Sequence, residues 1–384
     1  MLAAEIFFAL LNNCLFGKEL PESIAHSITE ERAELIYKCA KGHDVAQIIA
    51  SSVFENALDV PSDFSEKLKK QQLLAVFRYR NMKSELERIS ELFEAESIPY
   101  ILLKGAFIRD FYPEPYLRTS SDIDILVHEA DVVRAVALLC DKCGYTSSER
   151  SYHDYSMHSE SGVHLELHFN LLENMENIDR LLSHPWDHAL VIEGSYQYRF
   201  TNEFTLFHIV AHMSYHFATG GCGVRPFIDL YLLESKLSFD RASFEKMLLE
   251  CGLVKFYEAA KKLCLVWFEG LEQDEITQEM ERFILTGGVN GSKKKSIAAK
   301  QQRKGGKIAY ISERVFQPYG IMKEKYPILK KHKYLLPFCH VKRWFSLLKN
   351  GKMSDLKKEY NADKAVETQQ AEDMNAFLSK LGIN

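Results

Sequence analysis

The chain has 384 residues, of which 46% are hydrophobic and 26% charged, with only 19 glycines and 10 prolines. These proportions are typical of a globular protein and exclude a mainly disordered, collagen-like or low-complexity chain. The formal net charge is −5, which does not favour a protein built around nucleic-acid binding. No apolar run reaches the roughly 20 residues of a membrane helix, so we expect no membrane partner.

Eight cysteines are scattered along the chain, mostly within apolar segments. In a chain of this size, that distribution predicts reduced thiols and a cytoplasmic location. Cys140 and Cys143 form a single CxxC without a second pair. A zinc site needs four ligands, so we interpret this pair as structural.

The N-terminal third has the pattern of helices. Short amphipathic segments are predicted at residues 7–15, 29–40 and 44–54. Residues 61–96 repeat apolar side chains at spacings near three and four, which predicts one longer helix. We therefore expect a helical region over residues 1–96.

Residues 97–202 combine strand and helix patterns. Short apolar or alternating runs predict strands, and apolar residues at helical spacing predict short helices between them. The predicted strands are residues 100–103, 122–127, 152–159 and 163–169, and the predicted helices are residues 106–111 and 132–140. This order predicts a small mixed sheet.

Residues 203–384 have a helical pattern almost throughout. Basic residues concentrate here: residues 291–360 carry 19 Lys and Arg against 4 Asp and Glu. We interpret residues 290–306 as a flexible basic loop, and a surface that faces a polyanion is the alternative.

Two carboxylates lie close together on the predicted strand 122–127. Alternate residues of a strand share a face, so Asp122 and Asp124 point to one side while Ile123 and Ile125 point to the other. Two adjacent carboxylates repel unless a cation lies between them, and Mg²⁺ prefers oxygen ligands. An acidic strand end that faces solvent is the alternative interpretation.

A second acidic strand and a glycine turn accompany this pair. Glu166 projects from the predicted strand 163–169, and it becomes a third carboxylate at the same place if the two strands are neighbours. His164 and His168 share its face and are candidates for metal, substrate or packing contacts. Lys104 and Gly105 follow a strand and precede a helix, where a phosphate is readily bound.

The order of these pieces resembles the DNA polymerase β-like nucleotidyltransferase superfamily, and more closely a family of uncharacterised bacterial nucleotidyltransferases. The superfamily turn is usually Gly-Ser, whereas this chain has Lys104-Gly105. The matching elements are Leu103-Lys104-Gly105, Tyr112-Pro113, Arg118, the run Asp122-Ile123-Asp124-Ile125-Leu126-Val127, Leu165-Glu166-Leu167-His168, and downstream His212, His216, Arg225 and Asp229.

The resemblance implies an α+β fold, with a small mixed-sheet core flanked by N-terminal and C-terminal helical regions. It implies transfer of a nucleoside monophosphate from an NTP to an acceptor hydroxyl or phosphate, with release of pyrophosphate. Asp122, Asp124 and Glu166 would be the catalytic ligands of Mg²⁺ or Mn²⁺. The residues expected to bind the NTP are Lys104, Gly105, Arg118, Ser121, His168, Arg225 and Asp229. The acceptor would be a small molecule, a peptide or RNA.

Other interpretations remain open at this stage. The chain could be a catalytically silent nucleotide-binding scaffold, a nucleic-acid-binding protein that uses its basic C-terminal region, or a phosphoryl-transfer enzyme or phosphoesterase. Arg225 and Asp229 could simply pair on one helix. His208, His212 and His216 recur every four residues, a stripe that more often lies at the edge of a core than at a metal.

Overall fold

The computed structural model describes residues 2–287, 316, 319, 322–323, 326–349 and 368–383. The chain divides into two compact units, one comprising residues 1–215 and 222–289 and the other residues 216–221 and 290–384. The candidate site lies wholly in the first unit. In the second unit, helices α17 (Leu336–Lys349) and α19 (Thr368–Lys380) are described. The predicted basic loop at residues 290–306 lies outside the described residues.

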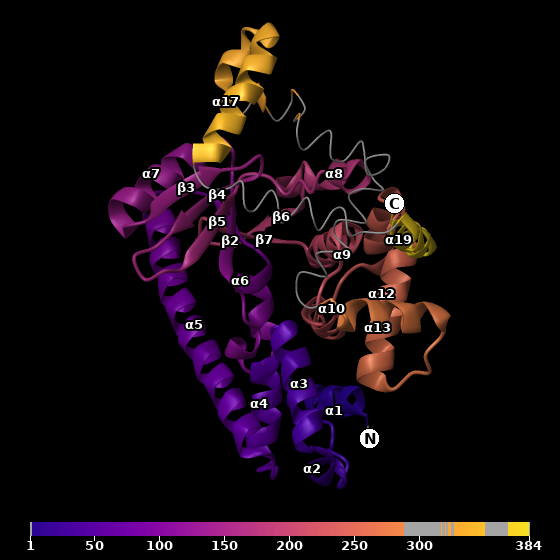
Figure 1. The fold of residues 1–384 in the computed structure, drawn as a ribbon. Coiled ribbons are helices and arrows are strands. Elements are labelled where there is room, and N and C mark those ends of the chain that lie inside the picture. The colour runs from indigo at the N-terminus through magenta and orange to yellow at the C-terminus, as the bar shows by residue number, and fades with distance from the viewer. Residues whose placement is uncertain are drawn as a thin grey trace. The chain divides into compact units, whose positions relative to one another are not determined.

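The N-terminal helices are confirmed. They are α1 (Ala3–Phe16), α2 (Ile24–Ser27), α3 (Glu30–Gly42), α4 (Ala46–Glu55) and the 34-residue α5 (Ser62–Ala95). The first eight residues of α4 are all buried, because α1, α3 and α5 pack around this helix. Helix α5 extends from this bundle to the sheet (Figure 1), so one long helix joins the two parts of the unit.

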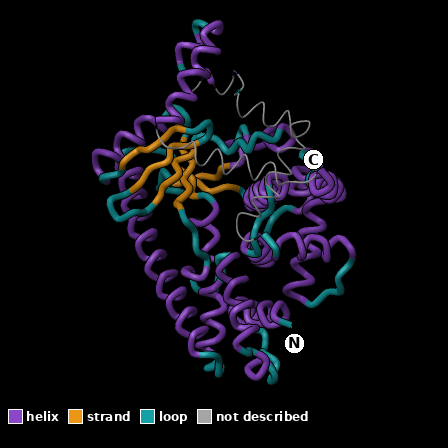
Figure 2. Tube along the Cα trace, viewed as in Figure 1, coloured by secondary structure: helices purple, strands orange, loops and turns teal. Residues whose placement is uncertain are grey.

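Seven strands of the described chain form one mixed sheet in the order β3-β4-β5-β2-β1-β7-β6. Figure 2 shows the sheet in orange. The strands are β1 (Tyr100–Leu102), β2 (Asp122–Val127), β3 (Thr146–Arg150), β4 (Asp154–His158), β5 (His164–His168), β6 (Ala189–Val191) and β7 (Gln197–Phe200). Strands β2 and β5 pair in parallel, and β4 pairs with β5 in the antiparallel sense. The two predicted acidic strands are therefore direct neighbours.

One face of the sheet carries the apolar core. Ile123 and Ile125 of β2 and Leu165 and Leu167 of β5 are all at most 2% exposed. They pack with apolar residues of α5 and of α7 (Val132–Cys143). Burial of this face fixes the register, because a slip of one residue would turn the carboxylates of β2 into the core.

Helices follow the sheet. They are α8 (Glu176–Leu182), α9 (Asn202–Thr219), α10 (Arg225–Lys236), α11 (Arg241–Glu250), α12 (Val254–Glu269) and α13 (Glu275–Leu285). Helix α12 returns to the N-terminal bundle, where Asn12 donates a hydrogen bond to the Trp267 carbonyl at 2.9 Å and Phe8 stacks on the Trp267 ring. None of the helices in the described part of the chain has the length and hydropathy needed to cross a bilayer.

The α+β class with a mixed sheet is confirmed, and the strand at residues 122–127 has the predicted bounds. Helix α6 (Lys104–Ile108) begins at Lys104 rather than at residue 106. Strands β3, β6 and β7 were not predicted, because they are short and carry many polar residues. The division of the chain at residues 96 and 202 remains a prediction.

One buried histidine makes the stability of this fold pH-dependent. His43, at the end of α3, is 1% exposed. Burial lowers its pKa from 6.5 to about 4, although a hydrogen bond with the Leu285 backbone opposes part of that shift. The unfolded chain therefore takes up a proton between these two values, and stability falls as the pH falls through this window.

We predict that lowering the pH from 7 to 5 costs the native state about 2 kcal/mol through His43 alone. Urea unfolding followed by circular dichroism at both pH values measures this loss. The His43→Leu variant should show a correspondingly smaller pH dependence. Exposed His26 provides the control, because His26→Gln should keep the wild-type dependence. Equal pH dependence in all three proteins would contradict the prediction.

Candidate active site

The face of the sheet opposite the core is polar across three adjacent strands. The register places Asp122 beside His164, and Asp124 beside Glu166. It also places Glu166 beside Ser156 of β4. Because paired residues of neighbouring strands project to the same side, these side chains form one patch. Two carboxylates of β2 and one of β5 thus come together, as the sequence predicts if the strands are adjacent.

The carboxylates form two overlapping groups. In one, ligand atoms of Asp122, His164 and Glu166 lie within 4.8 Å of one another, and in the other the same holds for Asp124, Glu166 and His168. Glu166 belongs to both. Each group could hold a cation, and the two groups share Glu166.

The two aspartates of β2 have different electrostatic environments. Burial and the charges of Asp124 and Glu166 raise the pKa of Asp122. Burial would also raise the pKa of Asp124, but Lys104 and a hydrogen bond with His168 outweigh it and lower that pKa. Asp124 is therefore a stable carboxylate, whereas the charge on Asp122 is unfavourable in the absence of a cation.

Lys104 lies at the edge of this patch. It adopts a φ of +34°, a conformation that costs a residue with a side chain of order 1 kcal/mol or more. Its Nζ atom lies 3.9 Å from Oδ1 of Asp124, which is longer than a hydrogen bond. Burial would lower the pKa of Lys104, but the charges of Asp124, Glu173, Glu166 and Asp122 raise it overall. The lysine therefore stays charged beside the acidic patch.

His168 lies deeper in the patch and is 4% exposed. Its Nε2 atom lies 3.0 Å from Oδ1 of Asp124 and 3.6 Å from Oε2 of Glu166. Burial would lower its pKa, but hydrogen bonds with these two carboxylates raise it to about 9. Ser121, by contrast, is exposed and donates a hydrogen bond to Oδ2 of Asp122 at 3.0 Å.

The glycine turn is tightly packed. A Cβ atom at Gly105 would lie 2.8 Å from Nη1 of Arg118 and 3.2 Å from Cβ of Ser120. Arg118 is held in place by a buried two-point contact, in which Nε and Nη2 donate to the carboxylate of Asp229 at 3.1 and 2.8 Å. Tyr112 donates a further hydrogen bond to Asp229 at 2.7 Å. Only glycine fits at position 105 without displacing Arg118.

Arg225 and Asp229 do not pair with each other on α10. Arg225 instead donates to Oδ2 of Asp44 at 2.7 Å and to the Thr119 carbonyl at 2.9 Å. Asp229 accepts a hydrogen bond from Arg118. Both residues thus connect α10 to the segment between Gly105 and β2. The ion pair between Arg225 and Asp229 that their spacing suggested does not form.

Two residues that the sequence did not single out also belong to this region. Glu173 accepts a hydrogen bond from Nδ1 of His212 at 2.7 Å and contributes to the potential at Lys104. Arg109 donates from Nε to the Gly105 carbonyl at 2.7 Å and from Nη2 to Ser120 at 3.2 Å. Neither could be recognised in the sequence, since Glu173 precedes α8 in a loop and Arg109 reads as an ordinary helical residue.

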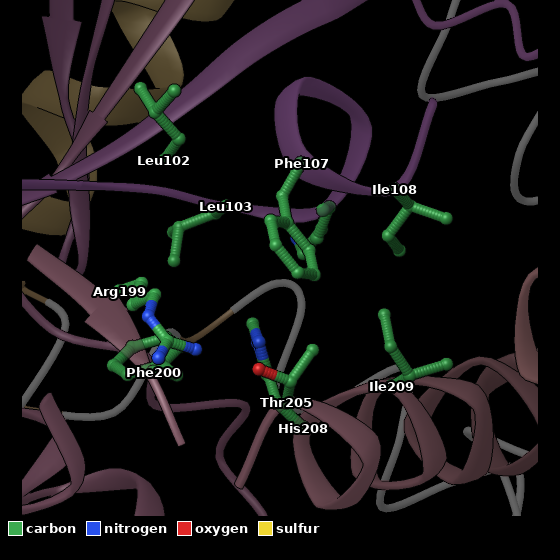
Figure 3. A pocket seen from close by; sticks show the side chains of 10 residues that line it. Leu102, Leu103, Phe107, Ile108, Arg199, Phe200, Thr205, His208 and Ile209 are labelled. Atoms are coloured by element: carbon green, nitrogen blue, oxygen red, sulfur yellow. The ribbon is translucent and has the colours of Figure 1, made fainter. Parts of the chain in front are cut away.

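A hollow adjoins Lys104 on the side of β1 and α6 (Figure 3). Its empty volume is about 380 Å³, including space that is open to solvent. Phe107 of α6 faces Thr205 and His208 of α9 across it (Figure 3). Burial lowers the pKa of His208 to about 3, so this ring is neutral. The hollow is lined by Leu102, Leu103, Lys104, Phe107, Ile108, Arg199, Phe200, Thr205, His208 and Ile209.

Comparison with known families agrees with this geometry. A family model described as an uncharacterised nucleotidyltransferase matches residues 29–269, well over half of the chain. The chain belongs to this family. The matched range contains all seven strands and every residue of the patch, and it makes the chain a nucleotidyltransferase by family. A search of curated proteins finds no match.

The packing at Gly105 gives a prediction about this nucleotidyltransferase. Gly105→Ala should lower the stability by about 1 to 3 kcal/mol, because the new methyl group displaces Arg118 from Asp229. Gly42, in α3, is the control, since a Cβ atom there meets nothing within 4 Å. Gly42→Ala should be neutral or slightly stabilising. Chemical denaturation measures both, and equal stabilities of the two variants would contradict the packing argument.

The different environments of the two aspartates predict opposite effects of removing their charges in metal-free buffer. Asp122→Asn should raise the melting temperature, because it relieves repulsion from Asp124 and Glu166. Asp124→Asn should cost about 1 to 3 kcal/mol, because His168 and Lys104 lose their partner. Asp59→Asn, at an exposed position, should change little. Calorimetry in chelator measures all three, and shifts of the same sign at Asp122 and Asp124 would refute the assignment.

Proposed function

We propose that the chain catalyses metal-dependent transfer of a nucleoside monophosphate from an NTP to an acceptor hydroxyl or phosphate. The observation that carries this proposal is the convergence of Asp122, Asp124 and Glu166 from two paired strands. Lys104 and the Gly105 turn adjoin this cluster. Carboxylates beside a cationic turn are the groups that a triphosphate with its metal ions needs.

The donor set fits a hard divalent cation. Each of the two groups that share Glu166 provides two carboxylates within 4.8 Å of a histidine, and Mg²⁺ and Mn²⁺ favour such oxygen-rich sites. Asp122, Asp124 and Glu166 would hold the ions. Bound there, the ions would offset charge on the phosphates and lower the pKa of the acceptor hydroxyl.

The remaining residues would position the substrate. Lys104 stays charged and points toward the acidic patch, so it would offset negative charge on the triphosphate. Ser121 and His168 adjoin the same carboxylates. The Gly105 turn would admit a phosphate close to the backbone, as glycine turns at strand ends do.

The more distant candidates are better explained as a support for this turn. Arg118 and Asp229 form a buried pair, and Arg225 pairs with Asp44. A buried pair of this kind seldom adds stability, but it fixes geometry. We therefore propose that Arg118, Arg225 and Asp229 hold the Gly105 turn in place rather than contact the nucleotide directly.

The hollow beside Lys104 would take part of one substrate. Phe107 and Phe200 supply aromatic faces, and neutral His208 and Thr205 supply hydrogen-bonding groups. Apolar walls with a few polar groups are typical of small-molecule sites. The side chains leave room for little more than one water-sized group, so we propose that a small substituent of one substrate enters here. The acceptor would be a small molecule, a peptide or RNA. We also propose a cytoplasmic location.

The proposed reaction predicts that the turnover rate depends strongly on Glu166. Turnover is measured as the release of pyrophosphate when the protein is incubated with an NTP, with Mg²⁺ or Mn²⁺, and with each of a panel of acceptors. Glu166→Gln should reduce turnover by roughly 100-fold to 1,000-fold or more, the scale of losing a key electrostatic group. Glu160→Gln, at an exposed position between β4 and β5, should keep wild-type turnover. Equal turnover in both variants would refute the proposed role of Glu166.

The same assay separates the rival functions. A silent scaffold would bind a non-hydrolysable NTP in calorimetry but release no pyrophosphate with any acceptor. A phosphoesterase would release inorganic phosphate instead of pyrophosphate. A nucleic-acid-binding protein would show binding of RNA or DNA that weakens steeply with salt and does not depend on Glu166.

A further inference from the structure

A second group of metal-binding side chains lies beside the acidic patch, on the β4 side. Asp154, the first residue of β4, pairs in register with His168, the last residue of β5. His153 precedes Asp154 in the chain. One ligand atom from each of His153, Asp154 and His168 lies within 4.8 Å of the other two.

The backbone of this group is held by local hydrogen bonds. The hydroxyl of Ser151 accepts hydrogen bonds from the backbone N–H groups of His153 and Asp154, both at 3.1 Å. The backbone N–H of Phe169 donates to the His153 carbonyl at 2.9 Å. Nε2 of His153 lies 2.9 Å from Oδ2 of Asp154, and the rings of His153 and His168 stack at 5.6 Å. The three side chains are thus close together on an ordered scaffold.

One atom of this group is buried without a hydrogen-bond partner. Nε2 of His168 faces Asp124 and Glu166, whereas Nδ1 of the same ring is buried and has no partner. The residue as a whole is 4% exposed. A buried ring nitrogen without a partner is costly, so native structures rarely leave one unsatisfied. A metal ion at Nδ1 would take the place of a proton on that nitrogen, while Nε2 keeps the proton that it donates to Asp124.

We infer that His153, Asp154 and His168 bind a transition-metal ion such as Zn²⁺, with Nδ1 of His168 as one ligand. Two imidazoles and one carboxylate are a donor set of zinc-type ions, whereas Mg²⁺ prefers oxygen alone. A metal-binding histidine commonly donates its other ring N–H to a carboxylate. In His168 the other ring nitrogen is Nε2, and Asp124 accepts its hydrogen bond. An ion at Nδ1 would therefore also fix the orientation of Asp124.

The inferred transition-metal site and the proposed magnesium site use different residues, so substitutions at one site can be tested without changing the other. The experiment titrates chelator-treated protein with Co²⁺, followed by visible absorption, and with Zn²⁺, followed by calorimetry, both in excess Mg²⁺. We expect one equivalent to bind. His153→Gln and Asp154→Asn should each weaken binding by at least about 10-fold. Glu166→Gln and His158→Gln, with His158 exposed on β4, should retain it.

Two results would overturn the inference. The first is the absence of Co²⁺ and Zn²⁺ uptake by the wild-type chain. The second is loss of binding in Glu166→Gln with retention in His153→Gln, because the ion would then occupy the acidic patch through Nε2 of His168. Melting temperatures in chelator establish that each variant is folded. Since none of these measurements needs turnover, the inference can fail while the proposed transferase activity stands, and the reverse also holds.

Discussion

The parallel pairing of β2 with β5 is the constraint on which the site depends. It places Asp124 directly beside Glu166 and Asp122 beside His164. Like charges on neighbouring strands repel each other and work against this pairing. The opposite face compensates, since the isoleucines and leucines of the same two strands are fully buried. A slip of one residue would bury charge and expose the core, so the apolar face holds the acidic residues together.

Two cationic side chains offset the negative charge that this strand pairing brings together. Lys104 approaches from the turn after β1, and His168 lies at the end of β5. Lys104 stays 3.9 Å from Asp124, whereas Nε2 of His168 lies between two of the carboxylates, 3.0 Å from Asp124 and 3.6 Å from Glu166. The unfavourable charge left on Asp122 is what a bound cation would relieve. The metal-free protein is therefore less stable at the position where the proposed reaction would need an ion.

The sequence predicted the parts of the site that follow from local periodicity. Alternation within residues 122–127 and 163–169 was sufficient to place Asp122, Asp124 and Glu166 on strand faces. The adjacency of the strands rested on the family resemblance, since nothing local determines it. Pairs that join distant segments could not be predicted: Arg118 meets Asp229 across 111 residues, and His212 meets Glu173 across 39. Only the folded chain brings such partners together.

The register also explains how one sheet face could hold the two kinds of ion that we propose. Toward β2 the side chains are carboxylates, whose oxygens suit a hard cation. Toward β4 the same face presents Asp154 together with His153, and nitrogen donors suit a softer ion. His168 belongs to both groups: Nε2 contacts Asp124, and Nδ1, which has no hydrogen-bond partner, is the ligand that we infer for the second ion. An imidazole cannot turn toward one neighbour without withdrawing from the other, so whatever holds Nδ1 also determines how firmly Asp124 is held.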